Sequence, residues 1–226
     1  MSISIAVGAS DVLAEIAGND IPMGAAIAYG VTILLLISGL LSIVGYTVWN
    51  GISPMPSSKA ARVAVAGEVD RLIRAGALSE GDVIVDAGSG WGHLAFYLAR
   101  RFPQLSVVGV ENSLLPLAVS RLARGLTVST NVAFRRGDLY QQDYTEAKLV
   151  VCYLYPGAMD RMRRTIHAAR VGTGARECLL ISVGFAFRGV PAERTTACRD
   201  MYRTPIYLYR LIAMAGMEQE NKSNPC

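Results

Sequence analysis

The most restrictive feature of this sequence is a long run without charge. No Asp, Glu, Lys or Arg occurs from Ile21 to Ser58, and residues 23–49 are almost wholly apolar or small. About 20 such residues in a helix cross the roughly 30 Å hydrocarbon core of a bilayer. The run has no polar face, as expected of a helix surrounded by lipid. It therefore predicts one transmembrane helix over 23–49.

Two other structures produce an apolar run, namely a buried core helix and a cleaved secretory signal. A signal peptide begins with basic residues and has a short apolar core. The first 20 residues of this chain instead hold three acids and no Lys or Arg. Both alternatives therefore fit less well than a membrane span.

The distribution of charge predicts an orientation. The first basic residues, Lys59 and Arg62, follow the apolar run closely. Because Lys and Arg near a span favour its cytoplasmic side, we expect a single-pass protein whose larger part faces the cytoplasm or a matrix-equivalent compartment. The net charge is +4 overall and +7 after the run, since three acids and no bases precede it. This charge suits anionic lipid headgroups. Nucleic acid is a less expected partner, because the basic residues occur in scattered pairs.

Cysteine and histidine spacing gives no metal site or disulfide framework. The sequence has four cysteines and two histidines, with no CxxC or Cys-His pair. Free thiols within apolar runs usually behave as small buried hydrophobes. They agree with a reducing compartment.

The part after the apolar run alternates β-rich and helical segments. This alternation predicts an α/β fold, a Rossmann-like parallel sheet with helices on both faces. We expect strands at 83–86, 106–111, 132–135, 149–154, 178–183 and 206–211, and helices at 59–75, 92–101, 114–125 and 158–169. We divide the chain into an N-terminal segment 1–22, a transmembrane helix 23–49, a linker 50–58, a globular domain 59–213 and a flexible tail 214–226.

A glycine-rich turn follows the first strand. It reads Asp86-Ala87-Gly88-Ser89-Gly90-Trp91-Gly92 and leads directly into a helix. Glycines there permit unusual dihedral angles and let a ligand approach the backbone, and the helix N-terminus supplies unpaired N–H groups. A dinucleotide-binding turn has the spacing G-x-G-x-x-G, which this turn does not have.

Acidic residues follow the next two strands. Glu111 ends the second strand 25 residues after Asp86 and precedes Asn112. A carboxylate there can accept hydrogen bonds from two vicinal ribose hydroxyls. Asp138 and Leu139 follow the third strand. Any one of these elements is weak, because acids and glycines often occupy turns for structural reasons. Their order at successive strand ends is more specific.

This arrangement resembles the class I, seven-strand S-adenosylmethionine (SAM)-dependent methyltransferases. The resemblance implies SAM as cofactor. The turn would hold its amino-acid and ribose parts, Glu111 its ribose hydroxyls and Asp138 the adenine amine. The residues that the resemblance implies for cofactor binding are Asp86, Gly88, Ser89, Gly90, Gly92, Glu111, Asn112, Asp138 and Leu139.

A narrower resemblance joins the apolar run to this domain. Pro54-Met55-Pro56-Ser57-Ser58, Gly109-Val110-Glu111-Asn112, Gly137-Asp138-Leu139-Tyr140 and Tyr207-Leu208-Tyr209 are similar to segments of the membrane-anchored protein-lysine methyltransferases. Enzymes acting on the ATP synthase c subunit and the adenine nucleotide translocase typify that family. The resemblance implies a protein substrate in or near the bilayer. The turn departs from the family at Trp91 and His93.

Aromatic residues gather where the methyl acceptor would bind. Tyr140 follows the third strand, and Tyr153 and Tyr155 stand at the expected end of the fourth. Their rings could hold a cationic amine, although Tyr153 and Tyr155 also fit ordinary strand aromatics. The Asn/Asp-Pro-Pro motif of many amino-methyltransferases is absent, which argues against nucleobase-amine or glutamine acceptors.

Two other functions fit the sequence. One is a methyltransferase for a lipid or a hydrophobic small molecule, which the anchor would bring to its substrate. The other is a non-catalytic SAM-binding membrane module. The intact acidic and glycine positions argue against that module.

Overall fold

The computed structural model describes residues 22–50, 57–170 and 177–212. The chain divides into two compact units, residues 1–53 and 54–226. Most of the predicted N-terminal segment, residues 51–56 of the predicted linker and the predicted tail lie outside the described residues.

The first unit contains one long helix, α2, over Met23–Asn50. At 1.5 Å per residue its 28 residues span about 40 Å. Among the described residues it is the one helix long and apolar enough to cross a membrane, over Met23–Leu41. A membrane anchor and a signal sequence both fit such a helix. A buried core helix fits poorly, because almost all of its described side chains are exposed.

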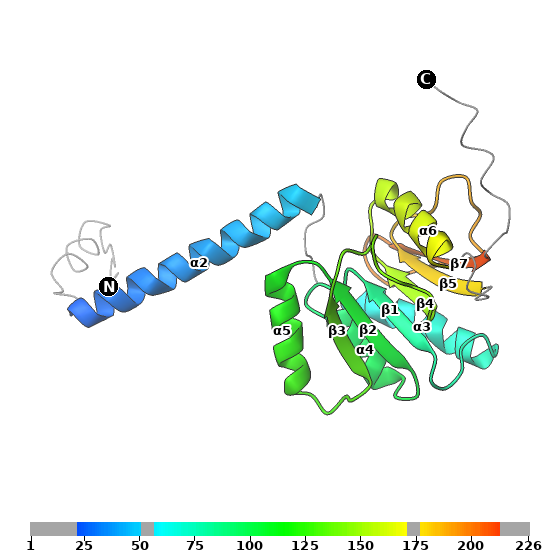
Figure 1. The fold of residues 1–226 in the computed structure, drawn as a ribbon, viewed down its shortest axis with the longest axis horizontal. Helices are drawn as coiled ribbons and strands as arrows, with labels where there is room; N and C mark the ends of the chain where they lie inside the picture. Colours follow the sequence, from blue (N-terminus) through cyan, green and yellow to red (C-terminus); the bar gives the residue numbers. More distant parts are fainter. Residues whose placement is uncertain (1–21, 51–56, 171–176, 213–226) are drawn as a thin grey trace, which may run out of the picture. The chain divides into compact units, whose positions relative to one another are not determined.

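The second unit is built on a seven-stranded sheet (Figure 1). Its strands are β1 Val83–Ala87, β2 Ser106–Glu111, β3 Val132–Arg136, β4 Ala147–Cys152, β5 Glu177–Val183, β6 Arg194–Ala197 and β7 Pro205–Ile212. They lie in the order β3-β2-β1-β4-β5-β7-β6. Strands β1 to β5 are parallel, and β7 pairs antiparallel with both β5 and β6. The carboxyl ends of β1 to β5 therefore share one edge of the sheet.

Helices cover both faces of this sheet. They are α3 Lys59–Arg74, α4 His93–Arg101, α5 Leu114–Gly125 and α6 Pro156–Arg170. Apolar residues of α3, α4 and α5 share a core with Ile84, Val107 and Val151 of the strands. Met159 of α6 instead contacts Cys152 and Ser182, which point to the other face. These layers confirm the predicted α/β fold class.

The structure corrects the sequence prediction at β4 and β6. The fourth strand begins at Ala147 and ends at Cys152, so Tyr153 and Tyr155 lie in the loop after it. Helix α6 begins at Pro156, earlier than predicted. Proline suits the first turn of a helix, where its missing N–H is not needed. Strand β6 was not predicted, because it has only four residues, Arg-Thr-Thr-Ala, and these are largely exposed.

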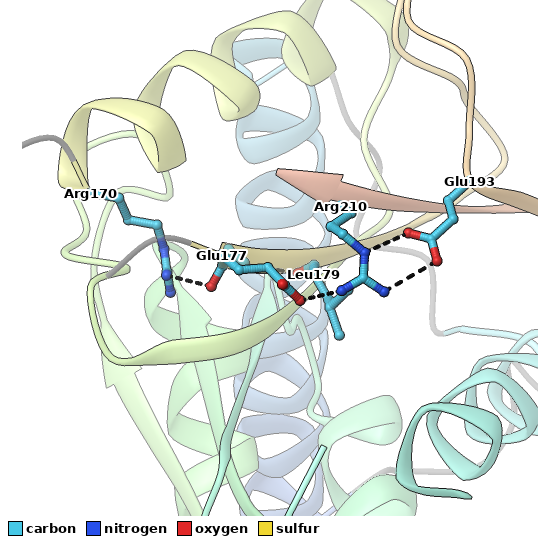
Figure 2. A network of polar contacts seen from close by, with 6 residues as sticks. Arg170, Glu177, Leu179, Glu193 and Arg210 are labelled. Carbon is cyan, nitrogen blue, oxygen red and sulfur yellow. Dashed lines mark hydrogen bonds and ion pairs between the residues drawn. The ribbon is translucent and has the colours of Figure 1, made fainter. Parts of the chain in front are cut away.

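Two arginines hold the amino-terminal part of β5 in place (Figure 2). The buried guanidinium of Arg170, at the end of α6, donates to the backbone carbonyls of Glu177 and Tyr144 at 2.7 and 3.1 Å. Arg210 of β7 bridges the carboxylates of Glu177 and Glu193 at 2.5 and 2.9 Å. A buried charge is costly unless its donors find partners. The hydrogen bonds of Arg170 offset this cost and join the end of α6 to the amino-terminal end of β5. The amino-terminal end of β5 lies at the edge of the sheet opposite the glycine-rich turn.

Candidate functional site

The glycine-rich turn takes a backbone shape that favours glycine. Gly88, Gly90 and Gly92 have φ angles of 83°, 53° and 81°, which side chains with a Cβ rarely adopt. The N–H groups of Gly88 and Ser89 donate to the carbonyl of Val110 at 2.9 and 3.0 Å. The turn therefore lies against the end of β2, with helix α4 starting directly after it.

The Glu111 side chain fixes the other side of this turn. Its Oε2 accepts from the N–H of Gly90 at 2.8 Å, and its Oε1 accepts from the N–H of Ser113 at 2.7 Å. The residue is only 3% exposed. Charge-assisted bonds of this kind are stronger than neutral ones. Each carboxylate oxygen can accept more than one hydrogen bond, so the same group could also receive ribose hydroxyls.

Asp86 lies buried beneath the turn. Burial is the main reason that the pKa of its carboxyl rises to about 7, and the neighbouring Glu111 raises it further. The backbone N–H of Ala95, in the first turn of α4, acts in the opposite direction. The Oδ2 atom of Asp86 is buried without a hydrogen-bond partner among the described residues. A polar or cationic ligand above the turn would satisfy this group, so the residues fit such a ligand.

The Ser89 hydroxyl is the second buried polar group at this end. Its Oγ also has no hydrogen-bond partner within the described part of the chain. Buried polar atoms are normally paired. Two unsatisfied side-chain oxygens around one glycine-rich turn therefore mark a place where a ligand would supply the missing contacts.

Phe134 of β3 packs tightly against two glycines beside the turn. A Cβ on Gly109 would lie 2.6 Å from Cδ1 of Phe134, and one on Gly92 would lie 2.7 Å from its Cζ. Leu139 approaches from the loop after β3, 3.8 Å from the Cβ position of Gly88. Phe134 therefore leaves no room for a side chain at Gly92 or Gly109, whereas a Cβ on Gly90 would meet nothing within 4 Å.

The segment after β3 is only half-buried. Asp138 Oδ1 accepts from the N–H of Tyr140 at 2.8 Å, and its Oδ2 lies 3.4 Å from Nε2 of Gln141. The carboxylate thus shapes its own turn while remaining partly accessible. Asn112, on the neighbouring β2 end, is exposed beside Glu111. These residues border the turn and extend the predicted cofactor site toward solvent.

The structure brings two of the three predicted tyrosines together. Burial, followed by the nearby Tyr155 hydroxyl, raises the pKa of Tyr140. Tyr155 is 46% exposed and directly precedes α6. The ring of Tyr153 lies against Gly184, directly after β5, where a Cβ would meet Cε2 at 3.0 Å. The predicted acceptor edge therefore has a Tyr140–Tyr155 side and a Tyr153 side.

The sequence prediction missed one member of this edge. The guanidinium of Arg161 stacks on the Tyr140 ring, 3.9 Å from its centroid. A cation–π contact of this kind fixes the ring. It also lowers the pKa of Tyr140, against the larger effect of burial. Arg161 stands in the second turn of α6, and a register starting at Pro156 would have placed it near the site.

Among the described residues, no group of three or more His, Cys, Asp or Glu could hold a metal ion. Cys152, Cys178 and Cys198 are buried free thiols. Burial raises the pKa of Cys152 to about 12, so this thiol stays protonated near neutral pH.

Parts of this chain are similar in sequence to known proteins. Residues 86–194 match the ANTKMT methyltransferase domain. A "Probable ribosomal RNA small subunit methyltransferase A" of Methanosarcina mazei is 36% identical over 89 residues, which is 39% of this chain and 31% of that protein. The match therefore spans about a third of the length of this curated relative.

Two solved structures share the fold. An RNA methyltransferase from Salinibacter ruber, in complex with S-adenosyl-L-homocysteine, has a TM-score of 0.55 and 24% identity, covering 73% of this chain and 98% of its own. Magnesium protoporphyrin IX methyltransferase from Synechocystis PCC 6803, with bound S-adenosylhomocysteine, has a TM-score of 0.53 and 16% identity, covering 79% and 98%.

The family match and the sheet order agree with the resemblance drawn from the sequence. The matched range contains the turn, Glu111, Asp138 and all three tyrosines. The order β3-β2-β1-β4-β5-β7-β6, with an antiparallel β7, is the seven-strand arrangement that the prediction required. The matching family is a methyltransferase domain, and both similar structures hold S-adenosylhomocysteine, in agreement with the predicted enzyme class and SAM cofactor. The chain therefore has the class I SAM-dependent methyltransferase fold, and residues 86–194, just under half of its length, match the ANTKMT methyltransferase domain.

Proposed function

We propose that this chain is a membrane-anchored methyltransferase that transfers a methyl group to a lysine amine of a protein in or near the bilayer. The observation that supports the proposal most is that one edge of the sheet carries two different groups of residues, a glycine-rich turn and a set of tyrosines. A preformed turn clamped by Glu111 lies beside an exposed aromatic edge. The spanning-length helix α2 in the same chain supports action at a membrane.

The residues of the turn would hold the cofactor. Gly88, Gly90 and Gly92 allow close approach of the amino-acid and ribose parts, and Ser89 offers a buried hydroxyl. Glu111 would accept the ribose hydroxyls, with Asn112 beside it. Asp86 would contact the cofactor through its buried Oδ2, which has no hydrogen-bond partner among the described residues. Asp138 and Leu139 would border the adenine. S-adenosylmethionine, when bound, supplies a methyl group on a positively charged sulfur.

The aromatic edge would orient the acceptor. The ring of Tyr155, and the face of the Tyr140 ring that Arg161 does not cover, can hold a cationic amine before it loses its proton. A lysine amine attacks only when neutral, and its usual pKa is about 10.4. The hydroxyl of Tyr140 has a raised pKa and therefore keeps its own proton. We infer that the amine loses its proton to water, so the rate of transfer rises with pH.

Lysine is favoured over other acceptors by the family resemblance and by the absence of an Asn/Asp-Pro-Pro motif after β4. The chain has Tyr153-Leu154-Tyr155-Pro156 there. The name of the Methanosarcina mazei relative mentions ribosomal RNA. RNA therefore belongs among the acceptors to be tested, as does lipid.

The test is to incubate the purified full chain with methyl-labelled SAM and separate membrane-protein, soluble-protein, lipid and RNA fractions. Label on a lysine of a membrane protein is the expected result. Label in lipid or RNA would replace the proposed acceptor. Cofactor binding without transfer to any fraction would favour the non-catalytic module. A Glu111→Ala chain, run in parallel, should transfer no label and serves as the control.

Helix α2 would anchor the chain with its methyltransferase domain on the cytoplasmic or matrix-equivalent side. The supporting observation is the net charge of +7 after the apolar run, with Lys59 and Arg62 closest to it. The full chain should then resist extraction from membranes by alkaline carbonate. Complete release into the soluble fraction would contradict the anchor.

A further inference from the structure

Helix α5 is apolar on the side that should be polar. A surface helix normally buries one apolar stripe and turns polar residues outward. In α5 the buried residues are Pro116, Leu117 and Ser120. The opposite side carries Leu115, Val119 and Leu122, spaced by four and three positions, with Leu126 directly after the helix. Leu122 is 69% exposed and Leu126 is 82% exposed. We call these four residues the α5 face.

The orientation of the α5 face is fixed by polar contacts on the inner side of the helix. Nε of Arg121 donates to the carbonyl of Phe134 at 3.2 Å, and Nε of Arg124 donates to the carbonyl of Val132 at 2.9 Å. Both carbonyls belong to β3, the edge strand of the sheet. These bonds hold α5 against the strand edge, so the α5 face points away from the domain.

Helix α6, in contrast to α5, buries its apolar residues and exposes charged ones. Its apolar residues, Met159, Met162 and Ile166, are buried. Its exposed side carries Arg161 and Arg164. The two helices have similar lengths and both cover the same sheet, yet only α5 exposes a continuous apolar stripe. Single exposed leucines are ordinary on protein surfaces, whereas a contiguous stripe indicates an interaction site.

The charges of the sequence segment that contains the α5 face have one sign. No Asp or Glu occurs from Asn112 to Gly137. Four exposed arginines lie within this segment, namely Arg121, Arg124, Arg135 and Arg136. An apolar face in a segment whose only charged residues are exposed arginines matches the boundary between headgroups and acyl chains in an anionic bilayer, where apolar side chains insert and cations meet lipid phosphates and carboxylates.

We propose that the α5 face is a membrane-contact surface, and that its occupant is the headgroup–acyl boundary of an anionic bilayer. The proposal deepens the proposed function and rests on it only in that α2 would bring the domain to a membrane. Helix α5 begins three residues after Glu111. Contact through its side would therefore hold the cofactor end of the sheet close to the bilayer, where an acceptor in a membrane protein would be reached.

The experiment uses the full chain in phosphatidylcholine vesicles with and without phosphatidylserine. An environment-sensitive fluorophore is attached to a cysteine at position 122 (Leu122→Cys), in a chain where Cys226→Ser removes the terminal thiol. The other three cysteines are buried. The matched control is Arg164→Cys on the exposed side of α6. Quenchers are brominated lipid chains from the bilayer and iodide from the water.

With phosphatidylserine present, we expect brominated lipid to quench the label at position 122 at least about twofold more than the label at 164, and iodide to do the reverse. Equal quenching at both positions in vesicles that carry the protein would overturn the α5 proposal. Protection of position 122 that depends on protein concentration in detergent, without lipid, would also overturn it and would favour a second copy of the chain as occupant.

Vesicle flotation separates this proposal from the anchor. If high salt and carbonate release the protein while position 122 is quenched by lipid at low salt, the anchor fails and the α5 contact stands. If the protein remains bound but position 122 stays open to iodide, the anchor stands and the α5 contact fails. A chain that never floats with anionic vesicles contradicts both.

Discussion

The two halves of the candidate site consist of different chemical groups. At the ends of β1 and β2, the site consists of backbone N–H groups, glycines with positive φ and the buried carboxylates of Asp86 and Glu111. At the end of β4, it consists of the rings of Tyr153 and Tyr155 in a loop, both more than 40% exposed. The first half is fixed before a ligand arrives, and the second has room to adjust.

This difference explains why the cofactor is easier to infer than the acceptor. A ligand of constant shape is matched by backbone geometry, and backbone geometry of this kind requires particular residues at particular spacings. An acceptor held by aromatic side chains makes contacts that many sequences can supply. Changes in the first half should therefore have larger effects than changes in the second.

The largest effect is expected for Glu111→Ala. The substitution leaves the N–H groups of Gly90 and Ser113 without their carboxylate acceptor and removes the proposed ribose contact. We expect SAM affinity, measured by calorimetry, to fall by about 3 kcal/mol or more, which is over a hundredfold. Glu80→Ala, an exposed site before β1, is the control. Equal affinities of the two variants would remove Glu111 from the site.

The second effect is on stability, for Gly92→Ala. Alanine at a φ of 81° is strained, and its Cβ would lie 2.7 Å from Phe134. We expect the free energy of unfolding in urea to fall by about 2 to 3 kcal/mol. Gly76→Ala is the matched control, because Gly76 also has positive φ, at 69°, but its Cβ would meet nothing within 4 Å. A loss no greater than that of the control would contradict the tight packing.

The third effect is a change in pH dependence, for Asp86→Asn. In the folded chain this carboxyl keeps its proton up to a pKa of about 7, against 3.8 for the ordinary group. The folded state therefore binds more protons between these values, so Asp86 lowers stability as pH rises from about 4 to 7. Asparagine does not titrate and should therefore remove this pH-dependent loss, measured by urea unfolding across that range.

Asp200 provides the opposite sign for comparison. The hydroxyl and backbone N–H of Thr204 lower the pKa of its carboxyl. Its stabilising contribution is therefore present above the unfolded pKa and is lost as pH falls. Asp200→Asn should destabilise the chain at neutral pH and spare it in acid. If Asp86→Asn showed this same pattern, the account of the buried carboxyl would be wrong.

The smallest effect is expected at the aromatic edge. Tyr155→Ala should lower kcat/KM for the acceptor by about five- to tenfold, because a ring–cation contact contributes about 1 kcal/mol. Tyr155→Phe keeps the ring and should lose less than about threefold. SAM affinity should be the same in both variants. A large drop in SAM affinity instead would assign Tyr155 to the cofactor half.

The sequence predicted the first half of the site better than the second. The spacing of Gly88, Gly90 and Gly92 and the distance to Glu111 are local patterns, and the structure brings these residues together. The buried Oδ2 of Asp86 was not predictable, because it depends on packing beneath α4.

The second half shows why local patterns fail. Tyr153 and Tyr155 alternate as strand residues do, so the pattern extended β4 past its end at Cys152. The contact of Arg161 with Tyr140 joins α6 to the loop after β3, and no local spacing relates these two residues. Strand β6 has too few apolar residues to give a period.

The most direct measurement is an experimental structure of the full chain with S-adenosylhomocysteine bound. We expect both ribose hydroxyls to lie within about 2.5 to 3.0 Å of the Glu111 carboxylate. We also expect the sulfur to face the loop that carries Tyr153 and Tyr155. A ribose bound away from Glu111, or a sulfur turned away from the tyrosines, would contradict the division of the sheet edge into a cofactor half and an acceptor half.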